Sequence, residues 1–380
     1  MGKMGNQSKK IAVVLGGAVA KGAFEAGVIQ ALARADVDIV RIVAASSGAL
    51  NGTVLASAVR ERDPIAGAET LAQLWRDHAE WNEVFRLSFH DIFKRDGMSD
   101  QERLLALLRD HVPPNQPDDP APVNLRLIVA ALRGCDGLIG ERPATTFESV
   151  RDFNSNDFAS PAGLEGVFTA AVASAAFPLV FAPVQIAGVG PCIDGGAVNN
   201  TPLQQALDGA LGAELDAVVV ISTSVEQHTE PPDDLNGFTP LVGHIANMLI
   251  DERLYRDLRH AERVNTKIAG LDQLARDGKL TLQQLADVKQ VLGWTTRRVV
   301  QIIPIRPSTM LPGNAFAGFF SAELRSEYLD AGYLRGLEVL GGLGWSHRPD
   351  APADARDDRV IAISPDPGGA AAPVEDDRVE

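Results

Sequence analysis

The fold is decided by two short apolar runs, each of which leads through a turn into a helix. The first is Ile11-Ala-Val-Val-Leu15, followed by Gly16-Gly-Ala-Val-Ala-Lys-Gly22 and a helical stretch over 23–33. The second is the run over 37–45, whose end Ala44-Ala-Ser-Ser-Gly48 leads into another helix. Continuous apolar runs of this kind are typical of parallel strands that are buried on both faces. The repeated order of strand, turn and helix therefore predicts an α/β fold with a parallel central sheet.

Further strands and helices follow along the chain, without an internal repeat. Apolar runs predict strands over 125–132, 184–186, 217–224 and 299–305. Helical spacing predicts helices over 63–112, 167–175, 241–292 and 321–340. By composition we expect four parts: a disordered start (1–9), an α/β catalytic core (10–225), a helical elaboration with a late strand and a closing helix in the same unit (226–345), and a disordered acidic tail rich in Pro, Ala and Gly (346–380).

The charge balance excludes some classes of partner. The chain has 35 Lys and Arg against 50 Asp and Glu, a formal net charge of −15. A nucleic-acid binder would usually be basic, so no nucleic-acid partner is expected, and global attraction to anionic lipid is disfavoured. Two cysteines, Cys135 and Cys192, cannot form a disulfide framework or a four-cysteine zinc site. A reducing, cytoplasmic compartment is the simplest interpretation, and a lysine-poor composition rich in Ala and Gly resembles bacterial proteins of high genomic GC content.

One segment imitates a membrane span. Residues 166–190 carry no charged side chain and are long enough to cross a bilayer. Pro178 and Pro183 would each break a hydrogen bond of such a helix, so we expect no transmembrane span but a short buried helix that ends in a buried loop. The polar first ten residues also lack the shape of a secretory signal.

The second predicted strand ends in a serine-rich turn that runs directly into a helix. A serine on a sharp turn from strand to helix is the geometry of a nucleophile elbow, in which the residues two before and two after the serine must be small. Around Ser46, Gly48 meets this requirement, and Ala44 is the smallest residue that has a Cβ atom. Two interpretations remain open: Ser46 is a nucleophile, or Ser46 or Ser47 is an ordinary helix cap.

A second segment places an acid beside two glycines. Asp194 follows a short predicted strand and precedes Gly195 and Gly196. This pattern indicates a carboxylate on a tight turn that other backbone approaches closely. The alternative is a simple Asp-Gly turn between two strands.

The turn after the first strand, residues 16–22, is a candidate anion site. Its glycines allow main-chain N–H groups to converge, and the following helix adds its positive dipole end. A phosphate-binding loop would end in Gly-Lys-Ser or Gly-Lys-Thr, but here Lys21 precedes Gly22. A dinucleotide fingerprint would require glycine where Val19 stands. No cofactor is therefore expected.

Together these segments resemble the patatin-like phospholipase family. The likeness rests on the glycine turn, the serine turn, Ala173-Ser-Ala-Ala-Phe-Pro-Leu-Val-Phe-Ala-Pro183 and Asp194-Gly-Gly-Ala-Val-Asn-Asn-Thr-Pro202, and it covers about 10–225, with an echo in 320–333. It implies a three-layer α/β fold, with a mostly parallel central sheet flanked by helices and a C-terminal helical elaboration. It also implies a lipid acyl hydrolase that cleaves carboxylic esters through an acyl-serine intermediate.

The resemblance assigns roles to individual residues. It implies a catalytic dyad in which Ser46 is the nucleophile and Asp194 is the general base. A base within hydrogen-bond reach takes the serine proton during attack. The implied oxyanion and substrate-binding residues are Gly17, Ala18, Val19, Lys21, Gly22 and Ser47, and the residues that support the turns are Ala44, Gly48, Gly195 and Gly196.

The chain departs from the family pattern at three places. Ala18 and Val19 stand in the glycine triplet, Lys21 replaces an arginine, and Ala44 replaces the first glycine of the serine motif. Lys21 keeps the positive charge but not the planar fork needed for a bidentate contact. A β-branched residue disfavours positive φ, so either the loop is distorted at Val19 or this valine merely lines the pocket.

Several alternatives remain open. A Ser–His–Asp triad would have to use His228 or His244, and none of the seven histidines lies in a metal-type cluster, so no metal is expected. The segment Phe316-Ala-Gly-Phe-Phe320 packs in the core or lines an acyl groove. Instead of a lipid acyl hydrolase, the chain could be a catalytically impaired binding or regulatory member of the fold, or a soluble thioesterase or esterase. The expected partner is a lipid or an acyl ester. Peripheral membrane contact stays an open alternative, and the oligomeric state is undetermined.

Overall fold

The computed structural model describes residues 8–84, 101–115, 117–139, 142–178, 180–225, 238–295 and 297–345. The chain divides into two compact units, Met1–His347 and Arg348–Glu380, and the second lies outside the described residues. The expected tail therefore falls almost wholly on that second unit. At the other end, the first strand already begins at Lys9, inside the segment expected to be disordered.

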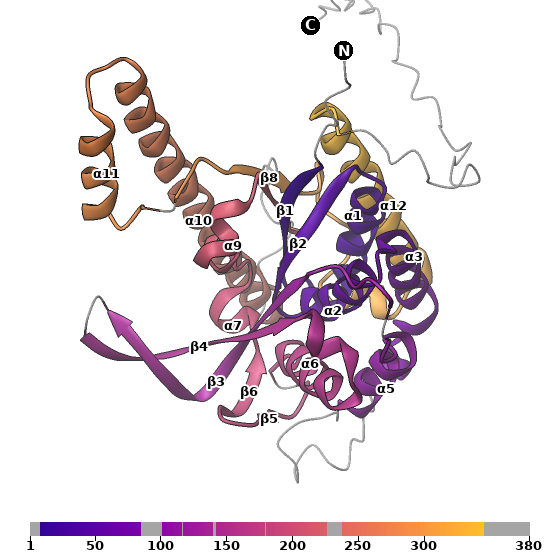
Figure 1. Cartoon of the computed structure of the whole chain (residues 1–380). Coiled ribbons are helices and arrows are strands. Elements are labelled where there is room, and N and C mark those ends of the chain that lie inside the picture. The colour runs from indigo at the N-terminus through magenta and orange to yellow at the C-terminus, as the bar shows by residue number, and fades with distance from the viewer. Residues whose placement is uncertain are drawn as a thin grey trace, which may run out of the picture. The chain divides into compact units, whose positions relative to one another are not determined.

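An eight-stranded sheet forms the centre of the first unit (Figure 1). The strand order is β5-β6-β3-β2-β1-β7-β8, with β4 paired to β3. β1 pairs in parallel with β2 and β7, as do β2 with β3 and β7 with β8, whereas β3/β4, β3/β6 and β5/β6 are antiparallel. The strands are β1 (Lys9–Leu15), β2 (Val37–Ala44), β3 (Asn124–Ile139), β4 (Arg142–Asn154), β5 (Val184–Ile186), β6 (Gly190–Asp194), β7 (Ala217–Ile221) and β8 (Gln301–Ile305).

Helices flank this sheet, which confirms the predicted α/β class with a mostly parallel centre (Figure 1). The described α-helices are α1 (Gly22–Ala33), α2 (Ser47–Arg60), α3 (Pro64–Gln73), α4 (Trp81–Val84), α5 (Glu102–His111), α6 (Pro161–Ser174), α7 (Gly196–Asn199), α8 (Leu203–Leu207), α9 (Gly209–Glu214), α10 (Phe238–Arg276), α11 (Leu282–Val291) and α12 (Ala322–Gly342). Ser321 caps α12, because its side chain accepts a hydrogen bond from Leu324 N at 3.2 Å. Among the described residues, no helix is long and apolar enough to cross a membrane.

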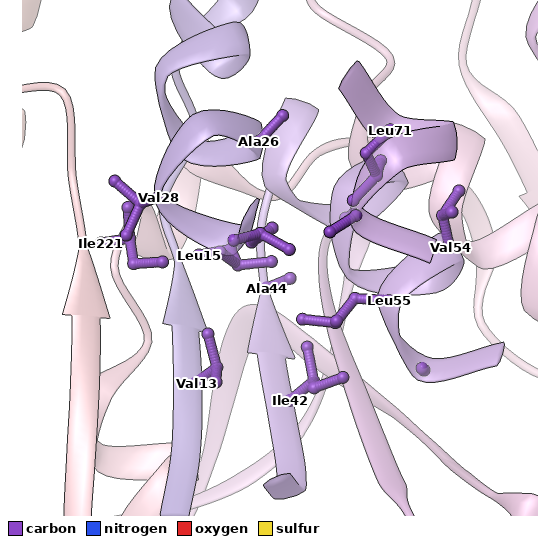
Figure 2. Packing of buried hydrophobic residues seen from close by; sticks show 14 of the residues in the cluster. Val13, Leu15, Ala26, Val28, Ile42, Ala44, Val54, Leu55, Leu71 and Ile221 are labelled. Carbon is purple, nitrogen blue, oxygen red and sulfur yellow. The ribbon is translucent and has the colours of Figure 1, made fainter. Parts of the chain in front are cut away.

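The two faces of the sheet bury separate apolar clusters. Along β1, Ile11, Val13 and Leu15 point into a cluster with α1, α2, α3, α6 and α12, and part of this packing is seen in Figure 2. Ala12 and Val14 point into the opposite cluster, which includes residues of α8 and α10. Side chains of a strand alternate between faces, so the continuous apolar run is explained by burial on both sides. In this three-layer arrangement, the carboxyl ends of the parallel neighbours β1 and β2 lie at the same edge of the sheet.

Several predicted elements need correction. The strand expected over 125–132 continues to Ile139 and forms a long hairpin with β4, which the sequence pattern did not predict. The predicted helix over 63–112 is interrupted by a π-helical turn at Leu74–His78, and α6 starts six residues earlier than expected, at Pro161. Residues 85–100 of the predicted helical stretch and residues 226–237, at the start of the expected helical elaboration, lie outside the described residues.

Candidate active site

Ser46 lies at the sharp turn between β2 and α2. Its φ of 55° and ψ of −133° are rarely adopted by a residue with a side chain and store about 1–3 kcal/mol of backbone strain. No side-chain hydrogen bond caps the helix at Ser46. Instead the Ser46 hydroxyl donates to Asp194 Oδ2 at 2.7 Å. The interpretation of Ser46 as an ordinary helix cap therefore does not fit the geometry.

Asp194 ends β6, which pairs with β3 in the sheet. The side chain is almost fully buried, and its Oδ1 accepts a hydrogen bond from Gly196 N at 2.7 Å. Burial raises the pKa of Asp194 to about 7, although the hydrogen bonds from Ser46 and Gly196 act in the opposite direction. The chain continues into α7, so the turn joins a strand to a helix and is not a hairpin between two strands.

The loop after β1 passes directly over the serine. A Cβ atom at Gly17 would lie 2.6 Å from the Cβ atom of Ser46, so only glycine permits this approach. The loop is held by side chains on two sides: Gly17 N donates to Asn200 Oδ1 at 3.1 Å, and Ala18 N donates to Ser47 Oγ at 3.0 Å. The amide of Asn200 returns a bond to the Gly17 carbonyl at 3.0 Å.

Val19 adopts the conformation that a valine disfavours. Its φ is 52°, and it also lines the pocket beside the serine, so both alternatives considered for this residue occur together. Its main-chain N–H has no acceptor within the described part of the chain. The loop geometry is therefore strained at Val19, while the contact between Ser46 and Asp194 remains intact.

Lys21 turns its amine away from the dyad. The ammonium group donates to the Leu311 carbonyl at 3.0 Å, and burial lowers the pKa of this lysine. Gly22, at the end of the loop, packs so closely on Trp75 that an added Cβ atom would lie 2.7 Å from the indole ring. Lys21 thus ties the loop to the segment before α12.

The other motif residues are small because backbone passes them closely. A Cβ atom at Gly48 would lie 2.8 Å from the Leu15 carbonyl oxygen, and one at Gly195 only 2.0 Å from that of Ile128. At Gly196 the added atom would meet Asp194 Oδ1 at 2.9 Å. Ala44 is fully buried at the end of β2 (Figure 2), where its Cβ atom is accommodated without glycine.

Two polar residues of the site were not singled out from the sequence. Ser174, at the end of α6, accepts a hydrogen bond from Ser46 N at 3.0 Å and donates to the Ile128 carbonyl at 2.5 Å. Its own carbonyl accepts from Gly195 N at 3.1 Å, so Ser174 connects the turn at Ser46 with the turn after Asp194. Asn200 holds the loop, as described above. Both lie in segments that carried the family resemblance, but neither has an ionisable or strongly nucleophilic side chain to attract attention.

A largely apolar pocket of about 120 Å³ opens beside the dyad. It is bordered by Ser46 and Asp194 and continues between α2, α3, α5 and the segment that follows α6. Its apolar lining includes Val19, Leu50, Val54, Leu71, Leu104, Leu108, Phe177, Phe181, Phe316 and Phe319. His78 also borders the pocket.

Aromatic rings surround one side of this pocket. Phe316 and Phe319 line it, so the Phe-rich segment is part of the pocket wall as well as of the core. Trp81 stacks on Phe320 with ring centroids 4.7 Å apart, and Phe177 meets Phe316 edge to face at 5.6 Å. Phe320 is 67% exposed, which is unusual for a phenylalanine. We call Trp81, Phe177, Phe316, Phe319 and Phe320 the aromatic rim.

Within the described residues, no group of three or more His, Cys, Asp or Glu side chains could hold a metal ion. No hydrogen bond joins a described histidine to Ser46 or Asp194. His228 lies outside the described residues, as does the side chain of His244, the other candidate for a triad. Cys135 and Cys192 are both free thiols.

A protein-family model matches the part of the chain that contains this site. The family model for patatin-like phospholipases matches residues 13–207, slightly more than half of the chain, and this range contains the loop, Ser46 and Asp194. Among solved structures, the chain is similar to VipD from Legionella pneumophila, with 14% sequence identity and a TM-score of 0.39 over 88% of this chain and 67% of that one. No curated protein matches the chain. On the strength of the family match, the chain belongs to the patatin-like phospholipase family.

Proposed function

We propose that the protein is a lipid acyl hydrolase, which cleaves carboxylic esters through an acyl-Ser46 intermediate with Asp194 as the general base. The observation that carries the proposal is the 2.7 Å hydrogen bond from the Ser46 hydroxyl to Asp194, at the mouth of an apolar pocket. Family membership supports a lipid hydrolase in general. The pocket can take an acyl chain, because its lining is mostly aliphatic and aromatic.

The proposed reaction uses the carboxylate twice. Ser46 Oγ forms a bond to the ester carbonyl carbon while its proton passes to Asp194 Oδ2. The tetrahedral intermediate then breaks the bond to the alcohol oxygen, and the leaving alcohol takes the proton from Asp194. A water molecule attacks the acyl-serine with Asp194 again accepting a proton, and the acid is released as Ser46 regains its hydrogen.

Main-chain donors are proposed to stabilise the oxyanion. The loop lies against Ser46, and the N-terminus of α2 directs its positive dipole end to the same place. The unpaired N–H of Val19 is the donor most readily available, since those of Gly17 and Ala18 already have acceptors. One such donor typically contributes about 3–4 kcal/mol to transition-state stabilisation.

The test is hydrolysis of a short p-nitrophenyl ester by wild type, Ser46→Ala and Asp194→Asn. We expect each variant to lose at least about a hundredfold in kcat while staying folded, because the nucleophile or its base is gone. A fluorophosphonate should label wild type at Ser46 with one equivalent and should not label Ser46→Ala. Full activity of Ser46→Ala would overturn the proposal.

The aromatic rim supports a substrate that is presented by a lipid aggregate. Exposed apolar side chains beside a pocket are a feature of membrane contact sites, and Phe320 is largely exposed beside the pocket wall. We therefore propose peripheral membrane contact through this rim. A soluble thioesterase or esterase would instead prefer monomeric substrate, so a comparison of micellar and monomeric esters distinguishes the two functions.

A catalytically impaired binding protein is the second candidate, and Val19 is the observation that favours it. A valine at a φ of 52° stores strain of about 1–3 kcal/mol where an oxyanion donor is needed. If this strain limits catalysis, Val19→Gly should raise kcat, whereas Val19→Ala, which keeps a Cβ atom, should raise it less. If wild type fails to react with the fluorophosphonate and Val19→Gly reacts, the impaired candidate is correct.

A further inference from the structure

A carboxyl group is buried directly behind the oxyanion loop, and the proposed mechanism does not use it. Glu25 lies in the first turn of α1, three residues after the loop ends at Gly22, and its side chain is fully buried. Burial raises the pKa of Glu25 well above its ordinary value, while the hydrogen bond from Asn51 acts in the opposite direction. Its Oε1 has no partner within the described part of the chain. A buried carboxyl group with half of its hydrogen-bonding capacity unused is costly, so its one side-chain contact must offset part of that cost.

That contact is with Asn51, which lies one turn into α2. The Asn51 amide nitrogen donates to Glu25 Oε2 at 3.1 Å and to the Gly22 carbonyl at 3.0 Å. Its Oδ1 accepts from the Trp75 indole at 2.9 Å. An indole N–H can only donate and a carbonyl can only accept, so these neighbours fix which end of the amide faces which partner. Glu25 Oε2 must therefore be an acceptor.

The amide connects the loop to the helix of the nucleophile. Gly22 is where the loop enters α1, and Ser47, one turn before Asn51 on α2, accepts a hydrogen bond from Ala18 in the middle of the loop. Two side chains of α2 thus hold the loop at two points. Without an acceptor at position 25, one amide hydrogen of Asn51 would be buried without a partner, and only the bonds to Gly22 and Trp75 would hold the amide in place.

We propose that Glu25 is a positioning residue, which acts through Asn51 to hold the oxyanion loop against the helix that follows Ser46. The inference rests on the proposed function, because loop position affects rate only if the loop stabilises a transition state. It requires an acceptor at position 25 but not a negative charge. Glutamine should therefore replace Glu25, since its carbonyl oxygen can accept from the same amide.

The experiment compares Glu25→Gln and Glu25→Leu with wild type on p-nitrophenyl butyrate. The active fraction is counted by fluorophosphonate titration, and Tm is measured for each protein. Thr53→Val is a matched control: Thr53 is fully buried on the same α2, but its hydroxyl bonds only to the Ala49 carbonyl of its own helix. If Glu25→Leu does not fold, Glu25→Met, which keeps the length of the side chain without its acceptor, takes its place.

We expect Glu25→Leu to lower kcat per active site by about tenfold or more with KM within about twofold, since small displacements of catalytic groups have large effects on rate. Glu25→Gln should stay within about threefold of wild type, and Thr53→Val should keep its kcat.

A purely structural role would lower Tm without changing kcat per active site, and that result overturns the inference. Equal losses in Glu25→Gln and Glu25→Leu overturn it as well. An inactive wild type would overturn the proposed function itself, whereas an active wild type with an equally active Glu25→Leu would overturn only this inference.

Discussion

At the scale of single residues, the site concentrates strain and buried charge at a few positions. Ser46 and Val19 both have positive φ, and Asp194 and Glu25 are acids with almost no exposure to solvent. Each of these features destabilises the folded state, and all of them lie within one hydrogen-bonded assembly around the loop and α2. Such features persist only where the surrounding structure fixes them, which is a common property of catalytic sites.

The ionisation of Asp194 predicts a pH-dependent rate. Because burial raises the pKa of this acid to about 7, and only the carboxylate can accept the proton of Ser46, activity should fall as the pH drops below that value. We expect kcat/KM to decline about tenfold per unit at low pH and to level off above neutral pH. The measurement is a pH–rate profile on an ester whose own hydrolysis is corrected for. A flat profile between pH 5 and pH 8 would contradict the assignment.

The same acid makes stability depend on pH. Since the pKa is about 7 in the folded protein against 3.8 as the ordinary value, the folded state binds the proton more tightly and loses stability as the pH rises through this interval. The loss approaches about 4 kcal/mol above neutral pH. Asp194→Asn should therefore raise Tm at pH 8 but much less at pH 4, while the exposed control Asp36→Asn should show no such difference.

The sequence patterns pointed to the two side chains that the structure brings into contact, Ser46 and Asp194, but not to the groups that support them. Ser46 and Asp194 could be found because a reactive side chain on an elbow, or before two glycines, is a local pattern that can be read along the chain. Ser174 and Asn200 act only through hydrogen bonds to the main chain, and which carbonyl or N–H they meet depends on segments far apart in the sequence. Spacing along the chain contains no information about such contacts.

At the scale of elements, α2 begins directly after Ser46, the proposed nucleophile, and forms a wall of the pocket. Leu50 and Val54 line the pocket at four-residue spacing along this helix, one and two turns after Ser46. At 1.5 Å per residue, Val54 lies about 12 Å along the helix from Ser46. Carbon–carbon bonds of about 1.5 Å make an extended acyl chain of roughly eight to ten carbons match this distance.

This geometry predicts an effect of Val54 on chain-length preference. Val54→Phe should shorten the pocket, so that kcat/KM for an octanoyl ester falls by about tenfold or more while a butyryl ester is affected much less. Val54→Ala should shift the preference to longer chains. The measurement is a series of p-nitrophenyl esters from four to sixteen carbons. Val59→Ala is the matched control, because Val59 is buried on the same helix but does not line the pocket, and an equal shift in that variant would contradict the prediction.

The β3–β4 hairpin shows where element prediction fails. Strands buried on both faces, such as β1 and β7, are visible as apolar runs. Along β4 most residues are polar and every position is exposed or only partly buried, so the strand is defined by its pairing with β3 and not by a core of its own. A sequence pattern based on burial therefore detects the buried strands that carry the site, but it misses the β3–β4 hairpin attached to them.

At the scale of the whole molecule, the distribution of charge restricts how the enzyme could meet lipid. Of the formal net charge of −15, the segment 346–380 holds nine acids against four arginines, which leaves −10 on the rest of the chain. A net negative protein is repelled by anionic lipid, and salt screens this repulsion within about 10 Å at 0.1 M. Contact with a bilayer must therefore depend on apolar groups, and the aromatic rim is the group beside the pocket.

Replacement of an exposed rim residue should separate binding to lipid from chemistry. Phe320→Ser removes a largely exposed ring that stacks on Trp81, so we expect weaker binding to phosphatidylcholine vesicles and slower hydrolysis of micellar ester, with hydrolysis of a monomeric ester nearly unchanged. Leu334→Ala is the control. Leu334 is also exposed, but it lies about 18 Å along α12 from the first residue of that helix, among acidic side chains. Phosphatidylglycerol added to the vesicles should weaken binding at low salt, because both surfaces are negative. Equal binding of Phe320→Ser and wild type to phosphatidylcholine would contradict a role for the rim.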